Sequence, residues 1–292
     1  MFGSNTPVGD AFKKKLKKCS FTNILCYSRS KYAENYFYCD MDKPREFNFE
    51  RNIGESTIVS FAPIWKTSSF LTNLSKNKPE FLAKVKHILV CSSSSAITKK
   101  YSFNKFDQEL SRNLIESENN LIQLCLKTKI KITIVQPSLI YGSSGNYADK
   151  NFSKIISIMR KLPFIFLPKS TGMRQPISCK QLAEVFIKLI DNSEFDCYLK
   201  DSRLLVGGDE ILSYREMLIK LRNSTNLNDK ARNCIFISVP DKVFILLFTP
   251  LIFFSIKYYE AIMRIFSNLS SFTFQSKITK KREDLFPIKS IY

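Results

Sequence analysis

The chain of 292 residues has only one histidine, and none of its eight cysteines forms a Cys-x-x-Cys pair. With His87 as the single imidazole, we expect neither a Cys/His zinc site nor a Ser-His-Asp triad. Most cysteines lie inside apolar runs, which is typical of buried free thiols in a reducing compartment. The sequence begins without the charged start and continuous apolar stretch of a signal peptide. We therefore expect a cytoplasmic protein without a bound metal.

An apolar run that could cross a membrane is also missing, since a spanning helix needs about 20 residues. The strongest run, from Val243 to Ile256, is interrupted by Thr249, Pro250 and Ser255. This run predicts a buried or an interfacial helix, and Lys257 with its flanking tyrosines suits an interface. A peripheral contact with the inner face of a membrane is one of the two alternatives.

Acidic residues are scarce relative to basic ones: Lys and Arg total 45, Asp and Glu total 26, and the net charge is +19. This charge favours anionic partners such as nucleotides, nucleic acid or an acidic membrane surface. We find no nucleic-acid-binding module, and the cluster 13–18 fits a solvated helix face, so no specific nucleic-acid partner is expected. Hydrophobic residues make up 44% of the chain, which excludes a disordered or a collagen-like protein.

Short β-type runs alternate with helical segments in the first half of the chain. Strands are predicted at 23–27, 36–39, 57–62, 87–91 and 131–135, and a long helix at about 107–127. This alternation predicts an α/β protein with a Rossmann-like, doubly wound parallel sheet. After Gly142 helical segments dominate, at about 150–162, 180–192 and 213–223. We expect a dinucleotide-binding domain over 1–142 and a smaller, mostly helical substrate lobe over 143–292, with an apolar helix at 243–256 and a basic tail from 277.

A glycine turn, Gly3-Ser-Asn-Thr-Pro-Val-Gly9, runs into the first predicted helix. Such a turn can hold a pyrophosphate at the helix N-terminus. Arg29 follows the next predicted strand, where a dinucleotide fold meets the adenosine ribose. An arginine there either suits the 2′-phosphate of NADP or is a surface residue of a basic protein. Asp40 ends the following strand and either meets the adenine or makes a turn.

Four further segments follow in a fixed order: 90–95, 135–142, 172–177 and 206–217. With the glycine turn, in this order and spacing, they resemble the NAD(P)-dependent nucleoside-diphosphate-sugar epimerase/dehydratase family, the extended or atypical short-chain dehydrogenases. The resemblance covers residues from about 3 to about 220. It implies NAD or NADP as cofactor, a nucleoside-diphosphate sugar as substrate and a link to cell-envelope polysaccharide synthesis.

The resemblance also implies roles for individual residues. Ser94 or its neighbour Ser95 would hydrogen-bond the reacting sugar hydroxyl or carbonyl, and Arg174 would reach the phosphates of the sugar nucleotide. The remaining positions would contact the cofactor: Gly3, Thr6, Pro7, Val8 and Gly9 in the phosphate loop, Ala62 and Pro63 along the cofactor, and Pro137 and Ser138 beside the nicotinamide.

The acid–base pair of the family, a Tyr-x-x-x-Lys, is where the sequence departs from the pattern. The register set by Arg112, Glu116 and Glu118 places Leu110 at the tyrosine and Leu114 at the lysine, and neither can transfer a proton. A literal Tyr-x-x-x-Lys occurs earlier, at 101–105. Tyr101 and Lys105 would share a face if they lay on one helix.

Two further departures concern the cofactor site. Thr6 replaces the middle glycine of the phosphate loop and would crowd the pyrophosphate, and only Met1 and Phe2 precede Gly3 where a central strand is expected. Either the start codon has been set too late or the cofactor site is damaged. The sequence thus leaves two hypotheses: an active sugar-nucleotide epimerase, dehydratase or reductase, or a family member that has lost catalysis and acts as a binding or scaffold protein.

Overall fold

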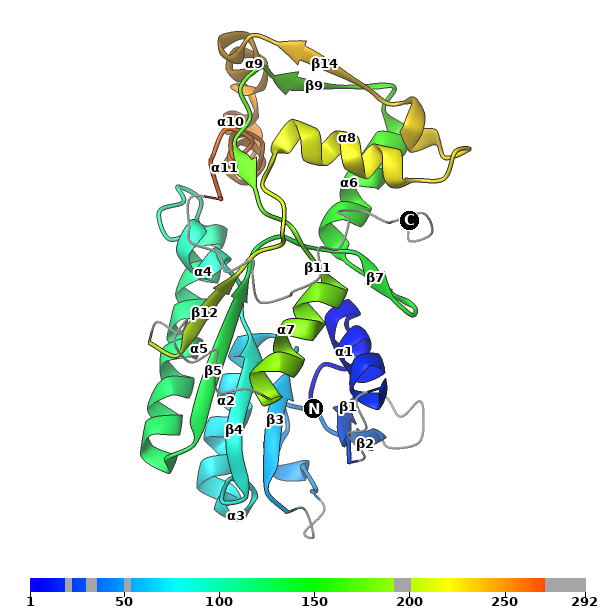
Figure 1. Ribbon diagram of the computed structural model, residues 1–292. Coiled ribbons are helices and arrows are strands. Elements are labelled where there is room, and N and C mark those ends of the chain that lie inside the picture. The colour runs from blue at the N-terminus through cyan, green and yellow to red at the C-terminus, as the bar shows by residue number, and fades with distance from the viewer. Residues whose placement is uncertain (19–22, 30–35, 50–53, 192–200, 271–292) are drawn as a thin grey trace.

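The computed structural model describes residues 1–18, 23–29, 36–49, 54–191 and 201–270 (Figure 1). Its central feature is a parallel sheet. Four strands pair in the order β12 (Arg203–Val206), β5 (Lys131–Pro137), β4 (Val85–Cys91) and β3 (Ser56–Ser60). Two shorter strands, β1 (Cys26–Ser28) and β2 (Tyr36–Tyr38), form a parallel pair. Five of these six strands coincide with predicted ones to within three residues at each end, and β12 was not predicted.

Phe2 joins the two parts of the sheet. Its backbone N–H donates to Val59 over 2.8 Å, and its carbonyl accepts from Phe61 over 3.0 Å. On the other side Tyr27 donates to the Met1 carbonyl over 2.8 Å. The order across the sheet is therefore β2, β1, Phe2, β3, β4, β5 and β12. Residues 1 and 2 occupy the place of the central strand that the sequence leaves almost unfilled.

Helices cover both faces of this sheet. On one face α1 (Pro7–Lys18) packs with α7 (Cys179–Asp191), and on the other α2 (Ile64–Asn77) packs with α5 (Lys105–Thr128), as Figure 1 shows. Phe12 and Phe186 fill the first layer, whereas Phe70 and Leu121 fill the second. Two one-turn helices, α3 (Pro79–Leu82) and α4 (Ser95–Thr98), and the 3-10 turn η1 (Pro44–Glu46) complete this part. The predicted doubly wound α/β fold is confirmed.

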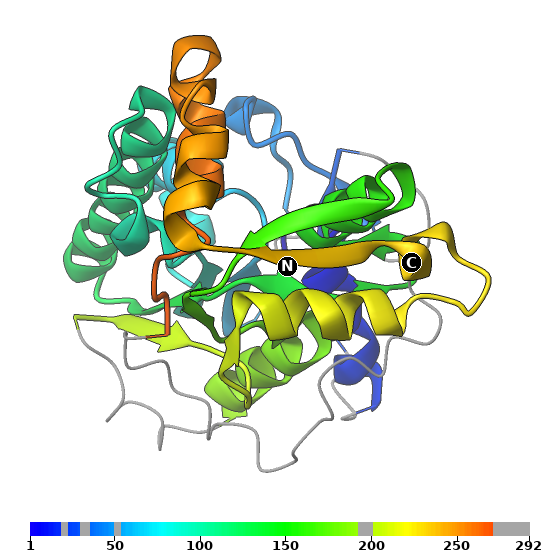
Figure 2. The ribbon, with the colours of Figure 1, turned by 90° about the horizontal axis from the view of Figure 1, so that it is seen from above.

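A smaller lobe lies beyond the carboxyl ends of the strands (Figures 1 and 2). Its core lies between α6 (Lys150–Lys161) and α8 (Tyr214–Ser224) and contains Phe152 and Met217. The lobe also has a parallel pair, β9 (Phe164–Pro168) with β14 (Ile235–Val239), an antiparallel pair, β10 (Met173–Arg174) with β13 (Leu212–Ser213), and the 3-10 turn η3 (Lys230–Asn233). Two further short strand pairs follow β5 and the sheet: β6 (Ile140–Tyr141) with β11 (Ile177–Ser178), and β7 (Ser143–Ser144) with β8 (Tyr147–Ala148).

Sheet and lobe are interleaved along the chain. Residue 142 marks the change predicted from the sequence, yet α7 and β12 follow it and pack with the sheet. The chain therefore passes from sheet to lobe, returns for α7 and β12, and enters the lobe again at β13. The first lobe segment is joined to the sheet at both ends, and the second is joined to it at its start.

The apolar run 243–256 is not one helix, and that prediction was wrong. It belongs to three short helices: α9 (Asp241–Phe248), α10 (Leu251–Phe254) and α11 (Ile256–Met263). The breaks fall at Thr249-Pro250 and at Ser255, whose hydroxyl accepts from the Tyr258 N–H at the start of α11. Within the run Phe244 alone is buried. Within the described ranges no helix is both long and apolar enough to cross a membrane. The predicted basic tail lies outside the described residues.

Candidate functional site

The glycine turn forms a tight loop between Phe2 and α1. Gly3 has φ +70°, in the left-handed region, and a Cβ there would overlap the backbone of Phe61 and Ala62. A Cβ on Gly9 would overlap the Gly3 carbonyl oxygen. Both positions therefore require glycine, and the loop brings backbone close to the end of β3 at the N-terminus of α1. This geometry fits a pyrophosphate-binding loop.

Thr6 occupies the middle of that loop, and its hydroxyl turns inward. Its Oγ1 donates to the Gly3 carbonyl over 2.9 Å and accepts from the Gly9 N–H over 3.0 Å. The hydroxyl thus caps α1 and closes the loop, as capping residues do. The neighbouring Asn5, which sequence reasoning missed, donates to the Ser28 hydroxyl over 3.1 Å and so ties the loop to the end of β1.

A cavity of about 510 Å³ lies between this loop and the connection from β7 to α6. Its wall combines the loop, two strand ends and the start of α6: Asn5, Thr6, Pro7, Val8, Phe61, Cys91, Ile140, Asn146, Tyr147, Ala148, Asp149, Lys150 and Asn151. Three predicted cofactor positions, Thr6, Pro7 and Val8, therefore face one space. Tyr147 and Lys150 contribute a phenol and an ammonium that the sequence pattern did not reveal. The sequence signal that could have identified these two residues is their position shortly after the Tyr141-Gly142 motif.

The predicted adenosine contacts lie at the ends of β1, β2 and β3. Arg29 directly follows β1 and is exposed. Asp40 makes a turn, in which its carboxylate accepts from the Asp42 N–H over 3.1 Å. Ala62 follows β3, and the exposed Pro63 caps α2. A second cavity, of about 300 Å³, lies beside them and is lined by Met41, Asp42, Pro44, Trp65, Lys66, Ser69 and Asn73.

Ser94 and Pro137 come together where β4 and β5 end. The Ser94 N–H donates to the Pro137 carbonyl over 3.0 Å, and Ser94 is the N-cap residue of α4. Among the described residues no hydrogen bond involves the hydroxyl of Ser94 or of Ser95, so both can serve a ligand. The Ser138 hydroxyl, by contrast, donates to the Gln175 carbonyl. The Ser138 hydroxyl is therefore already used to join the segment after β5 to the segment before β11.

Tyr101 and Lys105 do not share a helix face, which corrects the geometry expected for this pair. Tyr101 lies in the turn after α4 and is 84% exposed, and Lys105 is the first residue of α5. Asn104 caps α5, and its side chain accepts from the Asp107 N–H over 2.9 Å. Positions four apart stack only inside a helix.

At the family's acid–base positions α5 presents an apolar surface. Leu114 is 3% exposed and belongs to the core between α2, α5 and the sheet. Leu110 is partly buried and packs against the same core. Neither position has room or chemistry for proton transfer.

Arg174 is buried rather than open to a ligand. Its guanidinium donates to the Met173 carbonyl over 2.9 Å and to the carbonyls of Arg264 and Ser267. The side chain also lies over the Tyr214 ring, 5.4 Å from the centroid. Burial lowers the pKa of the arginine, and the nearby Tyr214 opposes this shift. In this structure Arg174 holds the segment after α11, so the predicted phosphate contact would require that segment to move.

The sequence matches no protein-family model, and no curated protein matches it significantly. Solved structures do match the fold. A GDP-mannoheptose C4 reductase from Campylobacter jejuni with NADP bound is 14% identical, with a TM-score of 0.58 over 83% of this chain and 90% of that chain. A UDP-N-acetylglucosamine 4-epimerase from Bacillus cereus is 16% identical, with a TM-score of 0.55 over 82% and 88%.

A dTDP-glucose 4,6-dehydratase from Bacillus anthracis in complex with NAD is 12% identical, with a TM-score of 0.57 over 82% of this chain and 84% of that chain. At these identities the three matches establish a shared fold. The fold that the resemblance implied is therefore confirmed, since nucleotide-sugar reductases, epimerases and dehydratases share it.

Proposed function

We propose that the chain binds NAD or NADP at the carboxyl edge of its sheet and takes a nucleoside-diphosphate sugar beside it, as an epimerase/dehydratase-like protein. The glycine loop carries this proposal, because Gly3 and Gly9 leave no room for a side chain where α1 begins. A helix N-terminus behind such a loop favours a pyrophosphate. Two proteins of the same fold were solved with NADP and with NAD.

NADP is the cofactor that we favour, on account of Arg29. The residue is exposed directly after β1, and the adjacent Ser28 is tied to the phosphate loop through Asn5. A guanidinium at this place can bind the 2′-phosphate of NADP by charge-assisted hydrogen bonds. Asp40, Ala62 and Pro63 would lie along the adenosine, and the cavity that contains Trp65 offers space for the base.

The sugar would lie beyond the ends of β4 and β5. A bound nicotinamide would supply hydride transfer, with Pro137 and Ser138 beside it. The hydroxyls of Ser94 and Ser95 would orient the sugar, since no described residue uses them. Proton transfer cannot come from the family's two positions in α5, where Leu110 and Leu114 stand. Tyr147 and Lys150 on the wall of the larger cavity are the alternatives to Tyr101 and Lys105.

A second candidate function is a catalytically degenerate relative that binds the same ligands as a scaffold. The burial of Leu114 in the core favours this function, because the leucine that stands in place of the family's lysine is part of a well-packed helix face. For either candidate we propose a cytoplasmic location. A sugar nucleotide would link the protein to the synthesis of cell-envelope polysaccharide, which uses activated sugars. The predicted peripheral membrane contact stays a proposal.

Calorimetric titration of the purified chain with NADPH and NADH tests the cofactor proposal. We expect both to bind and NADPH to bind more tightly. Arg29→Ser should weaken NADPH about tenfold to a hundredfold, as expected for the loss of a charged hydrogen bond, and leave NADH unchanged. Arg112→Ser, at another exposed arginine, is the matched control. Binding of neither nucleotide would overturn the proposal.

Turnover separates the two candidate functions. The chain would be incubated with NADPH or NAD and with UDP-, GDP- and dTDP-sugars, and the nicotinamide absorbance and the sugar products would be followed. Product formation that Tyr147→Phe abolishes supports an enzyme with a relocated acid, whereas loss in Tyr101→Phe assigns that role to the turn before α5. Cofactor binding without any product supports the scaffold.

A further inference from the structure

Large apolar side chains stand exposed on α9 and α10. Leu246 is 74% exposed, and Phe253 and Phe254 are 88% and 85% exposed. A folded chain ordinarily buries such side chains, and a contiguous exposed group marks a surface that contacts something else. The two phenylalanines are adjacent in a one-turn helix that packs on α11.

A second group of exposed aromatic residues lies in the turn that leads into α5. Tyr101, Phe103 and Phe106 are 84%, 89% and 66% exposed. Although this turn is about 150 residues away from α10 along the chain, it adjoins α11 in space. The Lys257 ammonium of α11 lies 4.3 Å from the centre of the Phe106 ring.

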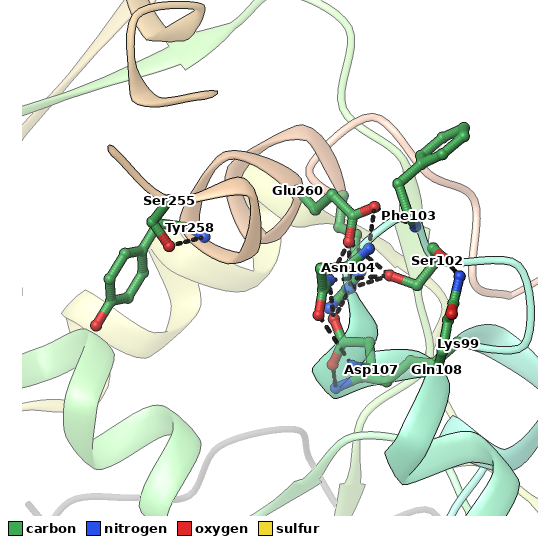
Figure 3. A network of polar contacts seen from close by, with 10 residues as sticks. Lys99, Ser102, Phe103, Asn104, Asp107, Gln108, Ser255, Tyr258 and Glu260 are labelled. Carbon is green, nitrogen blue, oxygen red and sulfur yellow. Dashed lines mark hydrogen bonds and ion pairs between the residues drawn. The ribbon is translucent and has the colours of Figure 1, made fainter. Parts of the chain in front are cut away.

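Polar contacts fix the turn relative to α11, the helix on which α10 packs (Figure 3). Glu260 of α11 accepts from the backbone N–H groups of Phe103 and Asn104 and from the Ser102 hydroxyl. Arg264 forms an ion pair with the buried Asp107. The exposed aromatic side chains are therefore presented by a braced framework, which lowers the conformational entropy lost on contact.

The charges around these side chains are mostly positive. The segments 99–106 and 242–259 contain no carboxylate, and Asp241, which directly precedes the second segment, accepts from the Ser170 N–H. They contribute four exposed lysines: Lys100, Lys105, Lys242 and Lys257. The neighbouring acidic side chains, Asp107 and Glu260, are occupied by ion pairs and hydrogen bonds. We call this surface the aromatic–basic face.

We propose that the aromatic–basic face docks on an anionic phospholipid bilayer. Aromatic and apolar side chains beside lysines match a membrane interface, where the rings enter the headgroup region and the ammonium groups meet anionic lipids. Among the described residues no helix is both long and apolar enough to cross a bilayer. The proposed contact is with the headgroup region. The proposal names the membrane-contacting residues and is independent of cofactor binding.

Co-sedimentation of the full chain with vesicles tests the proposal. We expect binding to vesicles of phosphatidylcholine with one quarter phosphatidylglycerol, and much weaker binding to phosphatidylcholine alone. Phe253→Ser combined with Phe254→Ser should weaken binding about tenfold or more, because two rings lose their insertion. The matched control combines Leu126→Ser and Leu227→Ser, which are exposed apolar residues outside the face, at 67% and 80%. It should bind as the unmodified chain does.

Circular dichroism and NADPH titration of the same samples show whether each variant is folded. Because both phenylalanines are exposed, we expect their replacement to leave fold and cofactor affinity unchanged. Equal binding to both kinds of vesicle, or equal loss in the control variant, would overturn the proposal. So would self-association without lipid, measured by sedimentation velocity, that disappears in the Phe253/Phe254 variant, since the face would then bind a second copy.

Discussion

The buried guanidinium of Arg174 joins β10 to the segment that follows α11. It donates to backbone carbonyls 90 and 93 residues further along the chain, and its side chain is almost fully shielded from water. Charged donors in such surroundings make stronger hydrogen bonds than neutral ones. We expect Arg174→Ala to lower the free energy of unfolding by about 2–4 kcal/mol, because the carbonyls lose their partners inside the protein.

Urea unfolding measures this effect. Arg174→Lys should recover only part of the loss, since one ammonium cannot reach both carbonyls as the planar guanidinium does. Arg112→Ala, at an exposed position of α5, serves as the control and should change the free energy of unfolding by less than about 0.5 kcal/mol. Unchanged stability in Arg174→Ala together with weaker sugar-nucleotide binding would return the residue to the phosphate role predicted from the motif.

For individual residues, the sequence was informative where the local backbone geometry determines the residue type. Gly3 and Gly9 could be predicted because a tight loop before a helix demands them. The contacts of Arg174 could not be predicted, because its partners are backbone carbonyls of a distant segment. Every residue has such a carbonyl, so the sequence does not indicate which ones the guanidinium binds. The pairing of Tyr101 with Lys105 failed for a local reason: Asn104 caps α5 between them.

Helix α11 is held against the turn before α5 by ionised carboxylates. Burial opposes the ionisation of Asp107, but hydrogen bonds from Asn104, Lys99 and Arg264 outweigh it and lower the pKa of its carboxyl. Because the pKa in the folded chain lies below that in the unfolded chain, the stabilisation is present at neutral pH. It is lost as the pH falls below about 4, where the unfolded carboxyl takes up a proton first.

The comparison of the unmodified chain with Asp107→Asn isolates this contribution. Urea unfolding at pH 7, 5, 4 and 3 should show a stability difference that is largest at pH 7 and shrinks below pH 4. Asp42→Asn, at an aspartate whose side chain is 55% exposed, should show a small difference at every pH. A difference between Asp107→Asn and the unmodified chain that stays constant down to pH 3 would contradict an ionised Asp107.

At the scale of elements, periodicity and composition predicted the sheet well. The predicted runs 57–62, 87–91 and 131–135 became β3, β4 and β5, since buried parallel strands are continuously apolar. Besides β12, two elements escaped. Met1 and Phe2 stand in the place of the central strand, too short for any pattern, and the neighbouring strands supply the pairing. The run 243–256 was predicted as one helix because its apolar character was given more weight than Pro250 and Ser255. The structure divides the run into three helices at these positions.

The path of the chain through the whole molecule predicts how it unfolds. The sheet contains Phe2 from the N-terminus and β12 from residues 203–206, and α7 lies between two segments of the lobe. Unfolding the sheet would therefore remove the anchors of both lobe segments. We expect a single cooperative thermal transition rather than separate transitions of a domain 1–142 and a domain 143–292.

Cofactor binding should raise the Tm of that single transition. If NADPH binds the folded chain alone, a concentration a hundred times its dissociation constant adds about 2.7 kcal/mol, which raises Tm by about 4 °C for a chain of this size. Differential scanning calorimetry with and without NADPH measures the shift, and emission from Trp65 of α2, the single tryptophan of the chain, reports on the sheet and its helices in the same experiment. Two resolved transitions, of which NADPH shifts only the one that Trp65 reports, would show that the lobe unfolds independently of the sheet in spite of the interleaved chain.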